Sequence, residues 1–503
     1  MRVPLLAGSR LTVVDVPDDA LVLRPPQPAE PLADIRAAVR EALRFPLDGQ
    51  PVQQLATRGG RATIVVEPPG MPIPSALRDP RQDALSATVA ELEQTGIPLE
   101  HQTILVAGGL GRKVGPREVE ALVPHELARR FAGKLEVHDV TSPDLVELGN
   151  AGRMSLRVHG ALCETDLVVT VTAAESVLHG GAATLAGASG PETLRASTAY
   201  SLLETAASSG WRIAVDLERE LSKRVPLIGV SLALNHPVVT GAFHGYPHDD
   251  RALERIAASP VRLAFRLAPG FVRSRLLGSI PRELTATSVL AGPPSVAHIE
   301  ALLRGVEARA VQIDEPLDIA VVGIPSTTPH LPREHPNPVL AAYLGLGYAL
   351  RLWRDAFPIA DGGTVILLSP FDRKFPHPSQ APYRTFFNSL RALGSRGATE
   401  PQELVAAELA AANDARAVDA YRAGRACHPL QPFVEWEACL PAVQRLGAIL
   451  VAGSRDAMAA RQFGFVPSRN FSAAMSMARA RSGGTPRVGF FVAPPYFPVR
   501  TGE

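Results

Sequence analysis

The stretch "ILVAGGLGRKVGPREVEAL", residues 104–122, indicates an α/β fold. Its apolar run, residues 104–107, is typical of a buried strand and ends at Gly108, Gly109 and Gly111. Pro116 stands where a helix prefers its first residue, and the residues after it continue at helical spacing. Turns of this kind hold phosphates or catalytic groups in α/β proteins. The stretch therefore predicts a parallel sheet and a ligand site at its edge.

The rest of the chain repeats this alternation of apolar runs and helical segments. Strands are expected at 62–67, 103–107, 135–140, 166–173, 318–326, 363–370, 445–453 and 487–495. Helices, such as the amphipathic segment 32–47, separate many of them. The pattern predicts two α/β domains with mainly parallel sheets. We expect an N-terminal domain over 1–310 and a C-terminal domain over 311–503.

The segment 250–310 has helical patterns without clear strands, and we interpret it as a helical insert of the first domain. It includes "ERIAASPVRLAFRLAPGFVRSRLLGSI", which is rich in arginine and carries phenylalanine. Such a face either contacts a membrane or nucleic acid, or is simply solvated, and the charge pattern favours the solvated face.

Composition excludes several classes of protein. The chain has 503 residues with 51 Lys plus Arg against 50 Asp plus Glu, and a net charge of +1 argues against a broad nucleic-acid footprint. The 3 cysteines form no CxxC pair, which is typical of reduced thiols. The sequence shows neither a signal-peptide h-region nor a run of ~18 apolar residues. We expect a cytoplasmic protein without nucleic-acid or membrane partners, and a homo-oligomer stays open.

The glycine turn lacks the known nucleotide-binding patterns. In "GLGRKVG", residues 109–115, the third glycine is one position too late for the dinucleotide fingerprint, and no Ser or Thr follows Lys113 as in a P-loop. Arg112 and Lys113 with the backbone of Gly108, Gly109 and Gly111 are therefore predicted to bind an anion at a helix start. The alternative is an ordinary turn with two solvated cations.

A second candidate site lies in "ESVLHGGAATLAGASG", residues 175–190. His179 is a candidate acid or base, and Gly180 and Gly181 allow a ligand to approach the backbone. The alternative is a structural histidine beside a tightly packed turn.

Two further histidine-bearing segments are candidates. His236, His244 and His248 invite a metal interpretation, but prolines and glycines break the segment and no matching Cys or carboxylate pattern accompanies them, so we predict no metal. The loop 324–338 follows an expected strand and holds candidate catalytic and ligand-binding residues, namely His330, Arg333 and His335. Loops at the carboxyl ends of parallel strands commonly bind ligands.

The order of these segments resembles the lactate racemase family, the nickel-pincer 2-hydroxyacid racemases and epimerases. Residues 137–171, "VHDVTSPDLVELGNAGRMSLRVHGALCETDLVVTV", follow that family's order of features. "ILVAGGLGRK" (104–113) lies where the family has A-T-G-T-H-R-P, and "HGGAATLAGASGPETL" (179–194) lies where it has S-G-G-x-K and E-T-I-x-x-N-H. "GVSLALNHPVVTGAFHGYP" (229–247) resembles its N-V-V-L-N…V-G-A-F-A-G-D segment. The resemblance implies an inter-domain cleft and a small hydroxy-acid or sugar-acid substrate.

The resemblance also shows where this chain departs from the family. The family's histidine in A-T-G-T-H-R-P falls on Gly111, whereas its arginine is kept as Arg112. The lysine that carries the pincer cofactor falls on Ala183, and the nickel-binding histidine falls on Thr198. The nearest counterpart of the family's second catalytic histidine is His179. The position of the family's substrate-binding arginine falls near Met71 in this chain.

These departures predict altered chemistry. Ala183 has no amine for a covalent link, and Thr198 is a poor nickel donor. We therefore expect a divergent racemase-like protein without the nickel-pincer nucleotide that acts on or binds a small anionic molecule in its cleft. An enzyme of this kind would be an isomerase. The alternative is a binding or regulatory paralogue that has lost catalysis.

Overall fold

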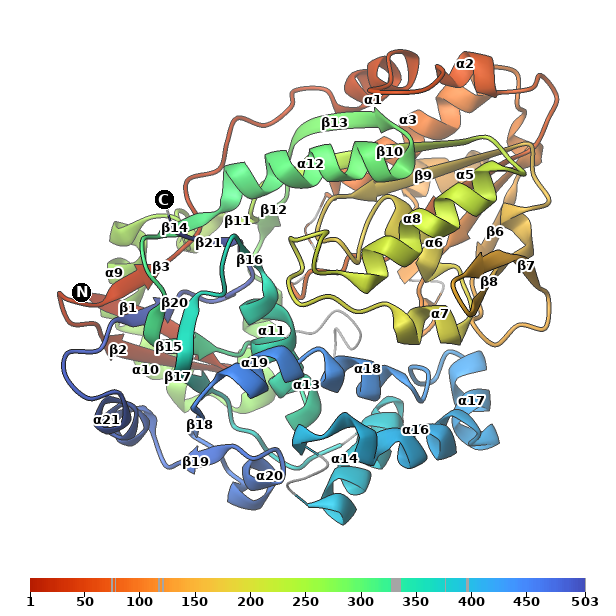
Figure 1. The fold of residues 1–503 in the computed structure, drawn as a ribbon. Helices are drawn as coiled ribbons and strands as arrows, with labels where there is room; N and C mark the ends of the chain where they lie inside the picture. Colours follow the sequence, from red (N-terminus) through yellow and green to blue (C-terminus); the bar gives the residue numbers. More distant parts are fainter. Residues whose placement is uncertain are drawn as a thin grey trace.

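The computed structural model describes residues 1–502 except 74, 75, 77, 116, 117, 120, 121, 327–335, 376 and 395–397. The chain forms two α/β bodies, with both termini on the side of the second body (Figure 1). The first body is built on a six-stranded sheet in the order β13-β10-β9-β4-β5-β6 and the second on a sheet in the order β19-β18-β17-β15-β20-β3. The expected α/β class with mainly parallel sheets is confirmed.

The first sheet contains the strand expected at the start of the glycine-turn stretch, residues 104–107. Its members are β13 (Ala286–Gly292), β10 (Leu227–Leu234), β9 (Leu167–Ala173), β4 (Ala62–Val66), β5 (Gln102–Val106) and β6 (Lys134–Val137). All neighbours are parallel except β13, which pairs antiparallel with β10. β4 and β9 are buried along their whole length, which explains why they are mostly apolar, with threonine as their only polar residue type.

Helices cover both faces of this sheet (Figure 1). Side chains of α1 (Ile35–Arg44) and α3 (Pro80–Gln94) pack on one face. α6 (Ala182–Gly187) and α8 (Ser209–Ser222) pack on the other, which α12 (Pro294–Arg309) also covers. The remaining elements of this body are α2 (Val52–Leu55), α5 (His125–Arg130), α7 (Pro191–Ala196), and the hairpin of β7 (Leu145–Ala151) and β8 (Met154–His159).

The second sheet is parallel throughout. Its members are β19 (Val466–Ser468), β18 (Ala448–Ala452), β17 (Ile359–Leu368), β15 (Leu317–Gly323), β20 (Val488–Phe491) and β3 (Leu21–Leu23). β3 pairs with β20, and the hairpin of β1 (Arg2–Ala7) and β2 (Arg10–Asp15) packs on the same body. The expected N-terminal unit, 1–310, therefore does not hold for the first two dozen residues, because their apolar side chains complete the second core.

Helices also cover both faces of the second sheet. α21 (Phe471–Ser482) packs on one face with the β1–β2 hairpin, and the other face carries most of the remaining helices. These are α13 (Pro338–Ala342), α14 (Ala381–Leu393), α16 (Val405–Ala412), α18 (Gln431–Glu437), α19 (Leu440–Arg445) and α20 (Ala457–Gln462), whereas α17 (Ala415–Arg422) packs through Tyr421 in a separate small cluster. A small parallel sheet joins β14 (Val311–Ile313), β21 (Val499–Thr501) and β16 (Trp353–Arg354).

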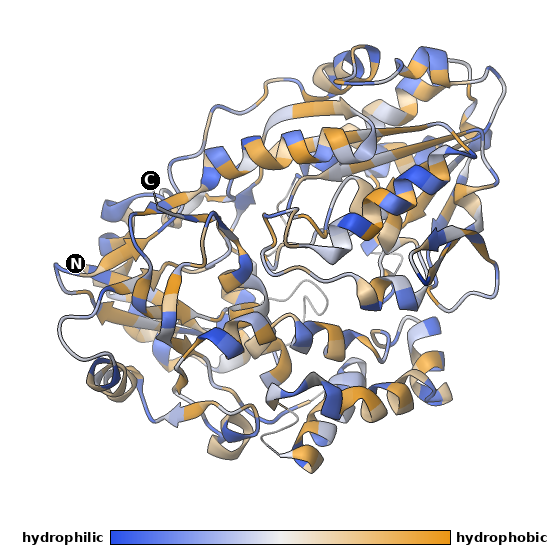
Figure 2. Ribbon diagram, viewed as in Figure 1, coloured by the Kyte–Doolittle hydropathy of each residue, from blue (hydrophilic) through white to orange (hydrophobic). Residues whose placement is uncertain are grey.

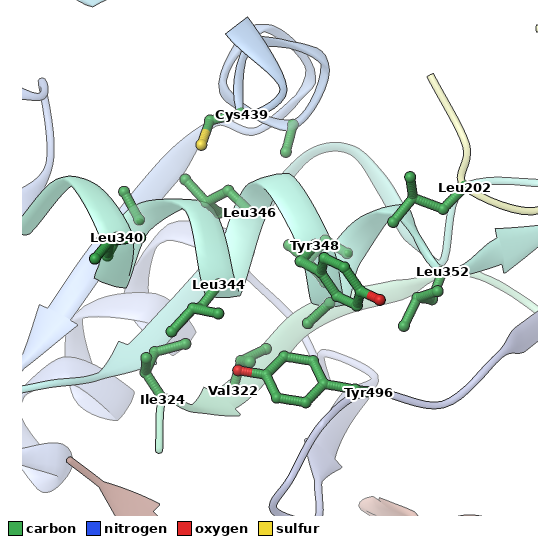
Figure 3. Close-up of a cluster of buried hydrophobic side chains, with 14 of the residues drawn as sticks. Leu202, Val322, Ile324, Leu340, Leu344, Leu346, Tyr348, Leu352, Cys439 and Tyr496 are labelled. Carbon is green, nitrogen blue, oxygen red and sulfur yellow. The ribbon is translucent and has the colours of Figure 1, made fainter. Parts of the chain in front are cut away.

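The apolar segment after α13 does not continue as an α-helix. It winds as a π-helix over Tyr343–Tyr348 and a 3-10 turn over Ala349–Arg351. Figure 3 shows this segment packed among buried side chains such as Leu344, Tyr348 and Tyr496. Orange, hydrophobic segments lie on the inner strands of both bodies in Figure 2. π-Helical turns of this kind occur frequently at functional sites.

The expectation of a strand-free segment over 250–310 is wrong in its second half. Three helices, α9 (Asp250–Ala258), α10 (Val261–Leu267) and α11 (Gly270–Gly278), are followed by β12 (Arg282–Glu283) and β13. β12 pairs with β11 (Val238–Val239), and β13 is the edge strand of the first sheet. The run "TATSVLAG" (285–292) is short and only partly apolar, because an antiparallel edge strand is buried on fewer sides.

Candidate functional site

A cleft of about 2120 Å³ is lined by residues of both bodies. Three loops of the first body reach it, each just after the carboxyl end of a parallel strand: β4 leads to residues 67–71, β5 to residues 107–112 and β9 to His179. Parallel strands present their carboxyl ends at one edge of a sheet, where ligands bind in α/β proteins. The opening turn and His179 therefore lie in one cleft.

The turn 108–113 also contacts the C-terminal helices. The carbonyl of Leu110 accepts a hydrogen bond from the backbone N–H of His428 at 2.9 Å, and the hydroxyl of Tyr421 lies 3.3 Å from the carbonyl of Gly109. Leu110 is buried in a small apolar cluster with Val140, Tyr421 and Leu430. The turn thus fastens the two bodies to each other on one side of the cleft.

Both cations of the turn are ion-paired. Arg112 lines the cleft, but its guanidinium pairs with the carboxylate of Glu118. Lys113 Nζ lies 2.7 Å from Asp139 Oδ2 and 5.6 Å from the centre of the Tyr421 ring, and it is not among the described residues that line the cleft. Gly108, Gly109 and Gly111 do line it. An anion at this turn would therefore have to compete with Glu118 for Arg112.

His179 faces the cleft close to the loop after β4. Its Nδ1 lies 3.3 Å from the hydroxyl of Ser176, and a Cβ on Gly70 would come within 2.8 Å of its ring. Burial lowers the pKa of His179, the Glu175 carboxylate raises it, and the charge of Arg351 lowers it further, for a net decrease. A neutral imidazole in a ligand-sized space is suited to accept a proton.

Gly180 and Gly181 serve packing in this structure. Both have positive φ, +106° and +53°, and a Cβ on either would lie within 2.5 Å of the side chain of His298 on α12. The backbone N–H of Gly181 donates to the hydroxyl of Thr172 at 2.9 Å. Neither glycine is among the described residues lining the cleft, and the close approach of α12 explains why both positions are glycine.

Two carboxyl groups belong to this part of the structure: Glu175 lies near His179, and Glu67 lies near Glu175. Glu175 is 6% exposed and accepts hydrogen bonds from the backbone N–H of Gly70 at 2.6 Å and from Arg81 at 2.9 Å. Glu67 is half-buried in the cleft wall, and burial and the nearby Glu175 carboxylate raise its pKa to about 8. Glu67 is therefore protonated at neutral pH and is suited to donate a proton.

Arg351 is a buried cation that sequence reasoning did not identify. It lies at the end of the 3-10 turn, lines the cleft and is 3% exposed. Its guanidinium donates to the carbonyls of Gly347, at 3.1 Å, and Ala199, its Nε has no hydrogen-bond partner, and no carboxylate of the described chain is within ion-pair distance. Burial lowers its pKa. Only the tertiary structure distinguishes this arginine from others in an apolar segment.

The positions that the resemblance assigned to the pincer cofactor lie in the same cleft. Ala183 and Thr198 both line it, and the Thr198 hydroxyl is engaged 2.8 Å from that of Ser209. Met71, which lies near the sequence position of the family's substrate-binding arginine, is 7% exposed in the cleft wall. With a methyl group where an amine is needed and a bonded hydroxyl where an imidazole is needed, these residues do not fit a covalent nickel-pincer nucleotide.

Of the remaining predicted residues, His236 also lines the cleft. His330, Arg333 and His335 lie outside the described residues. The rings of His236 and His248 pack edge to face at 5.3 Å, and burial lowers the pKa of each. No group of three or more His, Cys, Asp or Glu residues in the described chain is arranged to hold a metal ion. Among the described helices, none has the length and hydropathy needed to cross a bilayer.

Comparison with known proteins agrees with this architecture. Residues 8–201 match the family model of the lactate racemase N-terminal domain. The lactate racemase apoprotein from Thermoanaerobacterium thermosaccharolyticum has a similar structure, with a TM-score of 0.61 and 15% identity, over 99% of this chain and 100% of that one. A protein from Thermotoga maritima is similar at a TM-score of 0.50 and 11% identity, over 94% of this chain and 99% of its own. No curated protein sequence matches.

Proposed function

We propose that the cleft binds a small hydroxy acid or sugar acid, because this chain carries a lactate racemase N-terminal domain within a lactate racemase-like fold. The protein would act on this ligand, or only bind it, without the nickel-pincer nucleotide. The cleft combines a cation, a proton donor and a proton acceptor, which are the groups such a ligand needs.

The observation that carries the proposal is the buried, unpaired guanidinium of Arg351. A buried charge is costly unless an opposite charge or a full set of hydrogen bonds compensates it. Arg81 and Arg112 already have carboxylate partners, whereas Arg351 has none in the described chain. A ligand carboxylate in the cleft would supply that partner, with bidentate geometry available to the guanidinium.

Glu67 and His179 supply the acid–base capacity. One carboxyl is protonated and one imidazole is neutral at neutral pH, since burial dominates the pKa shift of both. In an isomerase of this type, one group removes the proton at the carbon next to the carboxylate and the other returns a proton. The substitution of an alanine and a threonine at the cofactor positions favours the alternative, a paralogue that binds without catalysis.

Ligand binding is tested by calorimetry and thermal shift with D-lactate, L-lactate and D-gluconate. Arg351→Gln should lower the affinity for a bound acid by about tenfold or more, because a charged hydrogen bond is worth about 1.5–3 kcal/mol. Arg354→Gln is the matched control, since Arg354 is nearby in sequence, faces Glu204 and does not line the cleft. If none of the acids binds, or if both variants bind equally well, the proposal is wrong.

Two checks separate binding from folding and from catalysis. Arg351→Lys keeps the charge, so a folded Arg351→Lys protein that retains binding supports the electrostatic role even if Arg351→Gln is unstable. Proton NMR in D2O then follows exchange of the hydrogen next to the carboxylate of a bound acid. If this exchange occurs and is abolished by Glu67→Gln or His179→Gln, the result supports the isomerase. If the acid binds but no exchange occurs, the result supports the non-catalytic paralogue.

A further inference from the structure

The helices α9, α10 and α11, together with β12, bring to the cleft a group of arginines without a carboxylate partner in the described chain. Arg255, Arg262, Arg275 and Arg282 all line it. None of the four has a carboxylate within ion-pair distance in the described part of the chain. Residues 251–282 contain seven arginines and one acidic residue, Glu254, in a protein whose overall net charge is +1. Four of the cleft's arginines that have no carboxylate partner in the described chain are therefore gathered on this one segment.

The cleft-facing sides of α10 and α11 pair cationic with aromatic residues. On α10 the cleft-lining residues are Val261, Arg262 and Phe265, and on α11 they are Phe271, Ser274, Arg275, Leu277 and Gly278. Arg262 and Phe265 are three residues apart, and Phe271 and Arg275 are four apart, so each pair lies on one helix face. Each face thus offers one guanidinium and one phenylalanine ring to the same space.

Backbone bonds restrain some of these guanidinium groups but leave donors free. Arg262 donates one hydrogen bond, to the carbonyl of Ala257 at 2.8 Å. Arg255 donates one, to the carbonyl of His244 at 2.6 Å, and Arg282 donates two. A guanidinium has five N–H donors, so capping of helix ends uses only part of each. Arg275 has no hydrogen bond of its side chain in the described structure.

We propose that Arg255, Arg262, Arg275 and Arg282 form an anion subsite that takes a phosphate-type, multiply charged group of the cleft ligand, with Phe265 and Phe271 against its apolar part. This inference rests on the proposed function, because the anion subsite and the proposed acid-binding site belong to the same cleft. Four cations that form no ion pair within the described residues exceed what a single carboxylate needs, and guanidinium geometry matches phosphate bidentately. The volume of about 2120 Å³ also exceeds the typical 300–1,000 Å³ of a small-molecule pocket.

The test compares two double variants of equal charge. Arg262→Gln/Arg275→Gln removes two cleft arginines, whereas Arg251→Gln/Arg266→Gln removes two exposed arginines of α9 and α10 that do not line the cleft. Calorimetry with inorganic pyrophosphate should show about tenfold or greater loss of affinity in the first variant only. Equal losses in both variants would mean general electrostatic attraction, and no binding to the unaltered protein would also overturn the subsite.

A second arm identifies the source of the phosphate. Leu263 and Leu267 on α10 are 56% and 76% exposed, so a lipid headgroup is a source besides a soluble phosphate ester. Co-sedimentation is measured with phosphatidylglycerol vesicles and, as a control, with phosphatidylcholine vesicles. If the protein binds only the phosphatidylglycerol vesicles and this binding requires Arg262 and Arg275, the phosphate belongs to a lipid. If pyrophosphate binding requires these arginines and the protein binds no vesicles, the phosphate belongs to a soluble ligand.

The two proposals fail separately. Loss of hydroxy-acid binding in Arg351→Gln with unchanged pyrophosphate binding identifies two functional regions of one cleft. If pyrophosphate binding depends on Arg351 and not on Arg262 and Arg275, the subsite is wrong while a ligand-binding cleft stands.

Discussion

Arg81 and Glu175 form a buried ion pair, with 2.9 Å between Nη1 and Oε1. The same carboxylate accepts hydrogen bonds from the backbone of Gly70 and Met71, which belong to the loop after β4. Arg81 lies on α3, and Glu175 follows β9. The pair therefore ties three elements together beneath His179 and keeps Arg81 from serving as a free anion-binding group.

Loss of Arg81 should destabilise the protein strongly. Arg81→Ala leaves the Glu175 carboxylate buried with one partner fewer, and removal of one member of a buried pair costs about 3–5 kcal/mol. Arg36→Ala is the control, because the pair of Arg36 and Asp83 is exposed and should cost at most about 1 kcal/mol. Urea unfolding followed by circular dichroism measures both. Equal costs for the two variants would contradict the buried role of the pair.

Glu67 should make stability depend on pH. Its folded-state pKa, about 8, is above its unfolded value of 4.5, so folding favours the neutral form. This contribution is fully present below pH 4.5 and is lost as the pH rises to about 8. The difference in unfolding free energy between the unaltered protein and Glu67→Gln should therefore fall across this window. Glu435 has a raised pKa as well, but its effect cancels in the difference. A difference that stays constant with pH would contradict the shift.

Gly70 is predicted to tolerate no side chain. A Cβ there would lie 2.8 Å from the ring of His179 and 3.0 Å from Glu175 Oε2, so Gly70→Ala should displace His179 and weaken ligand binding. Gly108→Ala is the matched control in the same cleft, because no atom lies within 4 Å of its added Cβ. Thermal melting and calorimetry with the bound acid compare them. If Gly108→Ala abolishes binding with unchanged melting temperature, the glycine turn itself contacts the ligand.

Tyr421 should stabilise the junction between the glycine turn and the C-terminal helices. Its hydroxyl accepts the backbone N–H of Val140 at 3.2 Å and lies 3.3 Å from the Gly109 carbonyl. Tyr421→Phe leaves a buried N–H unpaired, which costs about 1–3 kcal/mol. Hydrogen exchange should accelerate at Val140. Unchanged exchange and stability would show that the hydroxyl is dispensable. Tyr246→Phe serves as a comparison, because its hydroxyl bonds the Ala493 carbonyl and no N–H loses a partner.

The sequence by itself determined the α/β class and most of the strands. Buried parallel strands such as β4 and β9 are mostly apolar along their length, and this signal is local. The strands expected at 62–67, 103–107 and 166–173 share one sheet, and those at 318–326 and 363–370 share another. The antiparallel edge strand β13 and the participation of β3 in the second sheet were missed, since pairing with distant strands leaves little trace in short segments.

Only the tertiary structure decided which charges are paired. Arg112 and Lys113 are cations beside a glycine turn in the sequence, but Glu118 and Asp139 neutralise them in the fold. Arg351, by contrast, comes from an apolar segment and is buried without a carboxylate partner in the described chain. The free energy of a charged side chain depends on what surrounds it, and its neighbours here come from residues far away in sequence. Strand formation follows from local pattern, whereas the chemistry of the cleft follows from packing.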